Sequence, residues 1–165
     1  MPLLGDRNII SYTHHRSNGW HNRSSTSWGE VSSAYRITVT PKRSDSIIII
    51  KYNLCSSTAT HHALNNHRIK NVTDNSVPNP PTQPGSQNRA ESHCTTRGSH
   101  NADNVRLIVM SASLASWGTS AKVFTLDSQS WNSDIIRHNH SAGNSDSNVH
   151  WTSHLWAEAW ELEDV

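Results

Sequence analysis

The fold is decided by residues 44–55, which read SDSIIIIKYNLC. Four consecutive isoleucines stand here in a chain that is otherwise rich in Ser, Asn, Thr and His. β-branched residues at this density favour a strand, because their side chains are restricted in a helix and pack well on a pleated sheet. Side chains of a strand alternate between two faces, so the even positions from Ile48 to Leu54 would face a core and Ile47 and Ile49 would face away from it.

Further segments of strand length follow the same pattern, each bounded by Ser, Gly, Asn or Pro. Apolar and polar residues alternate in AYRITVT, and the Pro41 turn after it leads into the isoleucine strand. The other candidates are residues 62–73, 104–115, 120–128 and 132–140. Short strands at this spacing predict an all-β fold, an antiparallel β-sandwich of about eight strands.

The last apolar segment, HLWAEAWELE at residues 154–163, is ambiguous. Trp156 and Trp160 are four residues apart and Ala and Glu abound, which suits a helix. We favour a strand, because the rest of the chain is β and this segment is needed to complete a sheet.

Composition limits the size of the core and the kinds of partner. The 165 residues suit one domain, but only 33% are apolar and Phe124 is the single Phe, so the core must be thin. Charged residues are 16% of the chain and the formal net charge is +1, which argues against long solvated helices and against a nucleic-acid surface. The two cysteines, Cys55 and Cys94, can pair or stay as thiols, and the sequence does not decide between these states.

No segment approaches the roughly 20 apolar residues of a membrane span, and the start MPLLGDRNII lacks the features of a signal peptide. We therefore expect a soluble chain made without cleavage. Residues 1–30 are interpreted as an N-terminal arm with the first strand, and residues 31–165 as the sandwich domain. Residues 75–104 hold four of the six prolines and are interpreted as one long contact loop, with disorder as the alternative.

Three pieces of the sequence carry a resemblance when taken in order. They are ITVTPKRSDSIIIIKYNL, VRLIVMSASLASWGTSAKVFTLDSQSWNSDIIRHNHS and LWAEAWELE. Together they resemble a family of bacteriophage virion proteins, in which a strand leads through a Thr-Pro-Ser-like turn into an aliphatic strand and a Met-Glu-Ile-like strand ends the domain. The matching residues are 37–41, 46–50, 110–114, 121–124, 135–141 and 160–162.

The resemblance implies a jelly-roll β-sandwich, displayed on a phage particle as a fibre tip or head decoration and commonly a trimer without a cofactor. Ile47 stands where the family has Lys, and RHNHS replaces the family's Asn-Arg-Ser, so the chemistry of the loops is not carried over. A virion location, with synthesis in the host cytoplasm, follows from the same resemblance.

Ile47 and Ile49 are predicted to form a subunit interface. On a monomer they would leave a sticky, β-prone patch on the outer face of the strand. Burying both by a second subunit is worth about 3 to 6 kcal/mol per subunit before any ordering cost. The alternative is that a loop of the same chain covers them.

Twelve histidines raise the question of a metal site. His138 and His140 alternate on a predicted strand and so share a face, which in a trimer would bring six imidazoles to the axis and offer a transition-metal site. The alternative is that these are ordinary polar surface residues.

No sequence motif for catalysis is present. The chain lacks Gly-x-Ser-x-Gly, a phosphate-cradling Gly loop, His-Glu-x-x-His and Cys-x-x-Cys. Glu158, Glu161 and Glu163 are interpreted as a solvated edge. We therefore expect a protein that is not an enzyme.

The tryptophans divide into two groups. Trp20 and Trp28 lie in the polar arm SNGWHNRSSTSWGE, where isolated aromatic anchors would dock on another virion protein. The tryptophans next to predicted strands are expected in the core or an interface; they are Trp117, Trp131, Trp156 and Trp160. The overall prediction is a trimeric capsid decoration or fibre component, and the alternative is a tail-fibre adhesin that binds a host cell-surface glycan.

Overall fold

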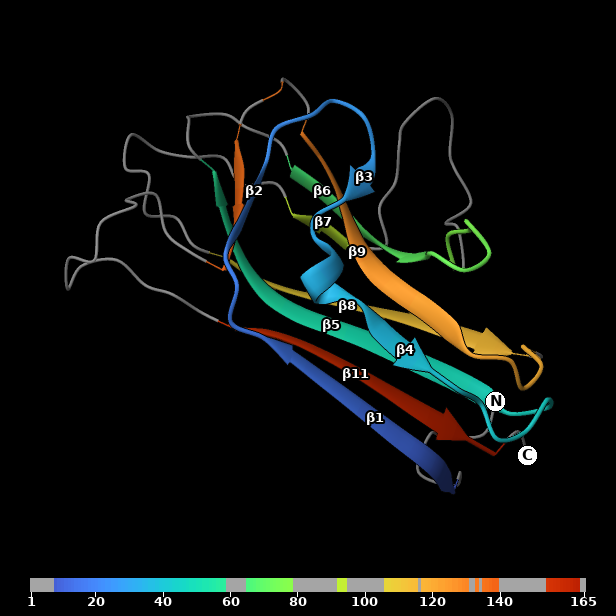
Figure 1. Ribbon diagram of the computed structural model, residues 1–165. Helices are drawn as coiled ribbons and strands as arrows, with labels where there is room; N and C mark the ends of the chain where they lie inside the picture. Colours follow the sequence, from blue (N-terminus) through green and yellow to red (C-terminus); the bar gives the residue numbers. More distant parts are fainter. Residues whose placement is uncertain are drawn as a thin grey trace.

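A computed structural model of the chain describes residues 8–58, 65–78, 92–94, 106–115, 117–130, 133, 135–139 and 154–163. Within these residues the chain is almost entirely β, and its strands form two antiparallel sheets that face each other (Figure 1). The predicted antiparallel sandwich is confirmed. The elements are β1 (Ile9–Ser17), β2 (His21–Arg23), β3 (Gly29–Glu30), the 3₁₀ turn η2 (Ser33–Tyr35), β4 (Ile37–Val39), β5 (Ile47–Thr58), β6 (Asn65–Asn71), β7 (Ser92–Cys94), β8 (Arg106–Ala115), β9 (Lys122–Ser130), β10 (Ile136–His138) and β11 (Leu155–Leu162).

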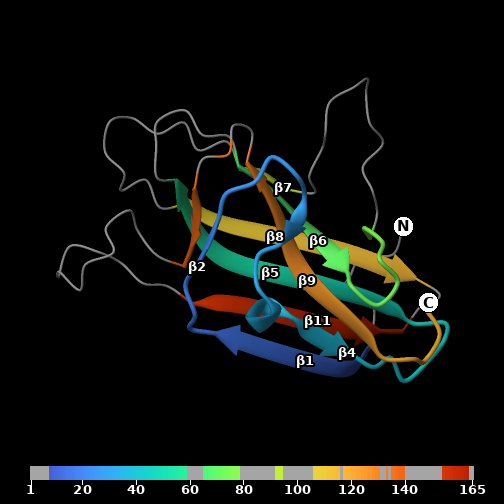
Figure 2. The same ribbon diagram turned by 45° about the horizontal axis from the view of Figure 1, so that its top comes forward.

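Each sheet is built on one long central strand. In sheet A, β5 pairs with β8 along one edge and with both β11 and β10 along the other, and β1 and β2 lie outside these two. In sheet B, β9 pairs with β6 along one edge and with β3 and β4 along the other, and β7 lies outside β6. Figure 2 shows the two layers from a second direction.

Three strand positions are occupied by two short strands in succession. β3 and β4 both pair with β9, and β10 and β11 both pair with β5. β1 pairs with β11 and β2 pairs with β10, so β1 and β2 together form the next position in sheet A. When each such pair is counted as one strand, the eleven strands of the described residues fill eight positions. Their order is 1-8-3-6 in sheet A and 2-7-4-5 in sheet B, which is the jelly-roll arrangement of two Greek keys.

The apolar core lies between the sheets. Ile48, Ile50, Tyr52 and Leu54 are all buried, so the even positions of β5 face inward as predicted. Opposite them, sheet B contributes a second set of buried side chains, namely Ile37, Val39, Ile69, Phe124 and Leu126. The isoleucine run therefore has one face in the core and one face outside it.

Glu161 corrects one interpretation from the sequence. Its side chain is buried rather than part of a solvated edge, and its carboxylate accepts four hydrogen bonds of 2.7–2.9 Å. The donors are the hydroxyls of Ser11 and Ser46 and the backbone N–H groups of Lys42 and Arg43. Burial would raise the pKa of the Glu161 carboxyl, but these hydrogen bonds outweigh burial and lower it. The carboxylate thus holds the turn before β5 against the end of β11.

The two ends of the chain and the long loop differ in how well they were predicted. Residues 155–162 form strand β11, which confirms the strand over the helix. The segment 75–104, expected as one loop, contains strand β7, which pairs with β6 and completes sheet B. The division of the chain at residue 30 stays a prediction; β1, β2 and β3 lie within the two sheets. No helix in the described part of the chain is long and apolar enough to cross a membrane.

Candidate interaction surface

The outer face of sheet A is the surface on which Ile47 and Ile49 lie. Four strands contribute to it side by side, in the order β1, β11, β5 and β8. Because the buried positions of each strand are known, the alternate positions define this face. We define the outer face of sheet A by these residues: Tyr12, His14 and Arg16; Trp156, Glu158 and Trp160; Ile47, Ile49, Lys51, Asn53 and Cys55; Leu107, Val109 and Ser111.

Large apolar side chains on this face are open to solvent. Tyr12 is 52% exposed, Trp156 46%, Val109 48% and Leu107 68%. Scattered exposed apolar residues are normal, but contiguous patches mark interaction sites. Cross-strand pairing places Trp156, Asn53 and Val109 in one row across three strands, so the two apolar side chains flank the polar Asn53.

The predicted interface residues lie in the middle of this face. Ile49 pairs with Trp160 on one side, and Trp160 pairs in turn with Tyr12, so these three residues form a second row. Ile47 and Ile49 are both half-buried. The prediction that they face away from the core is confirmed, whereas their contact with a second subunit stays a prediction.

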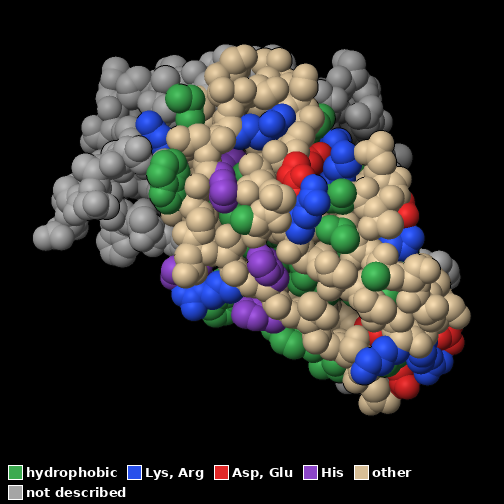
Figure 3. All heavy atoms as spheres, in the orientation of Figure 1, with side chains coloured by type: hydrophobic (Ala, Val, Ile, Leu, Met, Phe, Trp, Pro, Cys, Tyr) green, Lys and Arg blue, Asp and Glu red, His purple; other side chains and the backbone are tan. Residues whose placement is uncertain are grey.

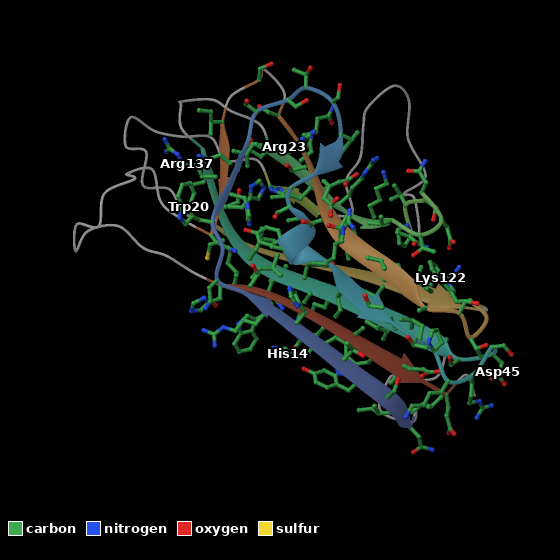
Figure 4. All side chains as sticks on the ribbon, in the orientation of Figure 1. His14, Trp20, Arg23, Asp45, Lys122 and Arg137 are labelled. Carbon is green, nitrogen blue, oxygen red and sulfur yellow. The ribbon has the colours of Figure 1, made fainter. Side chains whose placement is uncertain are left out.

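The aromatic side chains of this face are fixed by one another. The rings of Tyr12 and Trp160 lie 5.7 Å apart, and the rings of His14 and Trp156 lie 6.0 Å apart edge to face. Tyr12 donates a hydrogen bond of 3.2 Å to Glu158, and partial desolvation together with this carboxylate raises the pKa of the Tyr12 hydroxyl. His14 lies on the outer side of β1 in Figure 4, and hydrophobic side chains line the lower margin of the molecule over β1 in Figure 3. The aromatic rings of this face therefore lie against neighbouring rings of the same face.

The outer face of sheet B has the opposite character. Glu30 accepts two hydrogen bonds of 2.7 Å from Arg36 and one of 2.8 Å from Thr125. The hydrogen bonds from Arg36 lower the pKa of the Glu30 carboxyl against the effect of burial. Beside them Arg68 pairs with Asp127 at 3.0 Å. Glu30 and Asp127 on this face are thus each paired with an arginine of the same chain.

Trp28 belongs to this second face. Its ring lies 4.3 Å from the guanidinium carbon of Arg68, close enough for a cation–π contact. Trp20 lies between β1 and β2 and is 49% exposed. The structure does not bring the two tryptophans together, and their docking on another virion protein stays a prediction.

The predicted metal ligands lie elsewhere. His138 is fully buried between the sheets, where its Nε2 lies 3.1 Å from Nε2 of His67, and His140 lies outside the described residues. Among the residues that the structure describes, no group of three or more His, Cys, Asp or Glu side chains is placed to hold a metal ion. The axial site in a trimer stays a prediction. Cys55 is a free thiol on the outer face of sheet A, and the side chain of Cys94 lies outside the described part.

The sequence placed Ile47 and Ile49 on this face and put Trp156 and Trp160 in the core or an interface, but it did not identify the other residues. Tyr12 lies in β1; a first strand was expected within residues 1–30, but no sequence pattern located it. Leu107 and Val109 lie in the predicted strand 104–115, and the sequence did not show which side of that strand faces the core. The burial of Ala112 and Leu114 in the structure fixes the inward side of β8.

Comparisons with known proteins give little beyond the fold. No family model matches the chain, and no curated protein matches its sequence significantly. A chain in the structure of infectious bursal disease virus, Gx strain, is similar with a TM-score of 0.43 and 9% sequence identity. The alignment covers 92% of this chain and 41% of that chain, so this chain spans less than half of its length. At this level the similarity carries no argument about function, and the resemblance to the bacteriophage family stays an expectation.

Proposed function

We propose that the chain is a structural protein of a virus particle, which assembles through the outer face of sheet A. One observation carries this proposal: a jelly roll whose two outer faces differ, one closed by its own ion pairs and the other open and aromatic. Obligate interfaces between subunits are rich in aromatic and aliphatic side chains and poor in charge at their centre. Tyr12 and Trp160 beside Ile49 fit that composition, while the next row of the face carries the charged pair Glu158 and Lys51.

In finer terms, the proposed assembly is a homotrimer displayed on a bacteriophage as a capsid decoration or a fibre component. The trimer and the phage come from the family resemblance in the sequence, and the apolar face supplies a place for the contact. The proposed role is mechanical, needs no cofactor and involves no catalysis. The proposed partners are further copies of the chain and the capsid or tail protein that carries it.

Assembly is tested by measuring the mass of the protein in solution by light scattering at micromolar concentration. The wild type is expected to be a trimer. Ile49→Lys places a charge at the centre of the outer face of sheet A and is expected to give a monomer with an unchanged circular dichroism spectrum. Thr38→Lys is the matched control, because Thr38 is exposed on an outward position of β4 in sheet B.

Two results would contradict the proposal. One is a wild type that stays monomeric at micromolar concentration. The other is a trimer that Ile49→Lys leaves intact. Binding to a host glycan that Trp156→Ser abolishes without a change in mass would instead support the adhesin function.

A further inference from the structure

The space between the sheets is divided into an apolar part and a polar part. Along β5 the inward positions run from Ile48 to Leu54 and then reach Ser56, which is fully buried. In sheet B the inward positions change in the same way, from Leu126 to Ser128 and from Ile69 to His67. The inward side chains of this polar part are His21, Ser56, Asn65, His67, Ser128, Ser130 and His138.

A histidine pair joins the two sheets inside this polar part. His67 comes from β6 in sheet B and His138 from β10 in sheet A, and both side chains are 0% exposed. Their Nε2 atoms lie 3.1 Å apart and the ring planes meet at 84°. This is a hydrogen bond between imidazoles that crosses from one sheet to the other.

The neighbours of the pair fix its protons. Nδ1 of His138 lies 3.3 Å from the carbonyl oxygen of His21, and a carbonyl can only accept, so this nitrogen carries the hydrogen. Nε2 of His138 is then the acceptor, and Nε2 of His67 donates to it. Nδ1 of His67 is buried and meets no hydrogen-bond partner. Both imidazoles are therefore neutral in the folded protein.

A further proton has no favourable place in this arrangement. One proton, on either ring, would keep an N–H between the two Nε2 atoms but create a buried cation, and a second proton would set two N–H groups against each other across 3.1 Å. No carboxylate of the described residues faces the pair: Asp127 lies on the outer side of β9, bound to Arg68. On the elements packed around the pair, the titratable and charged groups nearest to it in sequence are His21 and Arg23 of β2, Tyr35 of η2, Cys55 of β5, Arg68 of β6, Asp127 of β9 and Arg137 of β10. Lys51 and Tyr52 of β5, Lys70 of β6 and Lys122 of β9 lie further along the same strands.

We infer that the hydrogen bond between His67 and His138 is an acid-sensitive clasp, which holds the polar end of the two sheets together while both imidazoles are neutral and releases it on protonation. Burial lowers the pKa of His67 to about 3, in agreement with the geometry. An unfolded His has a pKa of about 6.5, so the unfolded chain binds the proton first as pH falls. The stabilising effect is therefore complete above about pH 6.5 and is lost progressively between there and about pH 3.

The clasp is tested by urea unfolding of the full chain at about pH 7.5 and about pH 5. For one histidine with these two pKa values, the unfolding equilibrium constant of the wild type is expected to rise about 30-fold between the two conditions. His67→Gln keeps a polar group but cannot titrate, so its pH response is expected to be smaller by about that factor. His154→Gln is the control, because His154 is exposed just before β11 and is expected to keep the wild-type response.

Hydrogen exchange of the wild type covers the case in which His67→Gln does not fold. At about pH 5, after correction for intrinsic rates, amides of β6 and β10 are expected to lose protection before those of β11 and the first half of β5. Uniform loss along the chain, or none, would overturn the inference. So would equal pH responses of wild type and His67→Gln.

Two further outcomes distinguish the clasp from other causes. The acid response is expected to be the same at different protein concentrations, and a response that disappears on dilution would assign it to assembly instead. Zn²⁺ alone is the probe for metal binding. If it stabilises the wild type at about pH 7.5 and not His67→Gln, the pair is a ligand set and the acid-sensitive clasp is wrong.

Discussion

The two outer faces of the sandwich differ in the side chains that they present to solvent. On sheet B, Arg68 covers Asp127, Arg36 covers Glu30, and the ring of Trp28 lies over Arg68. On sheet A, Tyr12 and Trp156 are about half exposed. The ring of Tyr12 lies beside Trp160, and the ring of Trp156 lies beside His14. The outer face of sheet B thus carries arginine–carboxylate pairs, whereas the outer face of sheet A exposes apolar side chains to water, which is unfavourable in free energy. This difference is the basis for placing the proposed contact on sheet A.

The largest effect is expected from two adjacent isoleucines on opposite faces of β5. Ile50→Ala removes a fully buried side chain and is expected to lower the free energy of unfolding by about 3 kcal/mol. Ile49→Ala removes a half-buried side chain and is expected to cost the monomer less than about 1 kcal/mol. Urea denaturation at a protein concentration low enough to keep the chain monomeric measures both. Equal losses would break the distinction between the two faces.

Next comes the buried ion pair of sheet B. The Asp127 side chain is 1% exposed, so Arg68→Ala leaves a buried charge without its cation and is expected to cost about 3 kcal/mol or slightly less. Thermal and urea unfolding report the change. Arg16→Ala serves as the comparison, because Arg16 is exposed on sheet A and its loss is expected to leave the monomer's stability unchanged. If both variants behave alike, the charges of sheet B do not stabilise it.

A third prediction concerns Glu161, a buried carboxylate that accepts four hydrogen bonds. Glu161→Gln keeps the size of the side chain but brings an amide N–H₂ toward donors, and is expected to cost about 2 kcal/mol at neutral pH. The lowered pKa of Glu161 means that its stabilising effect is present above the ordinary carboxyl pKa and is lost as pH falls through its native pKa. Unfolding curves of the two proteins should therefore converge in acid. A difference that persists there would contradict the role of the ionised form.

The smallest effect is expected for the exposed ion pair. The Arg36 side chain is 42% exposed, and a surface pair of this kind adds little even at 2.7 Å. Arg36→Ala is expected to leave the midpoint of thermal unfolding unchanged within error. A clear drop would show that the network on sheet B stabilises the fold as a unit rather than through Asp127 alone.

The sequence predicted the parts of the fold that have a local pattern. The run from Ile47 to Ile50 predicted a strand with two apolar faces. Residues 155–162 were predicted as a strand because a further segment was required to complete a sheet. β1 was not singled out, since its inward positions are polar residues such as Ser11 and Thr13, which give no apolar alternation. Ladder hydrogen bonds to β11 hold it in place instead.

The polar contacts in the interior could not be predicted from the sequence for a different reason. His67 and His138 are 71 residues apart, and no pattern in the sequence around either residue indicates that the two are in contact. Glu161 was interpreted as solvated because three of its donors lie in a turn more than 110 residues earlier and the fourth, Ser11, lies in β1. Contacts of this range depend on the order of strands in the sheets, which no local pattern contains.

The break between β10 and β11 has a consequence for variation of this protein. Both strands pair with the same edge of β5, β10 with its last residues and β11 with its first. The register of β10 is thus set by residues 56–58 and the register of β11 by residues 47–53. A change at one end of β5 is therefore expected to release the strand paired there and to leave the other strand in place.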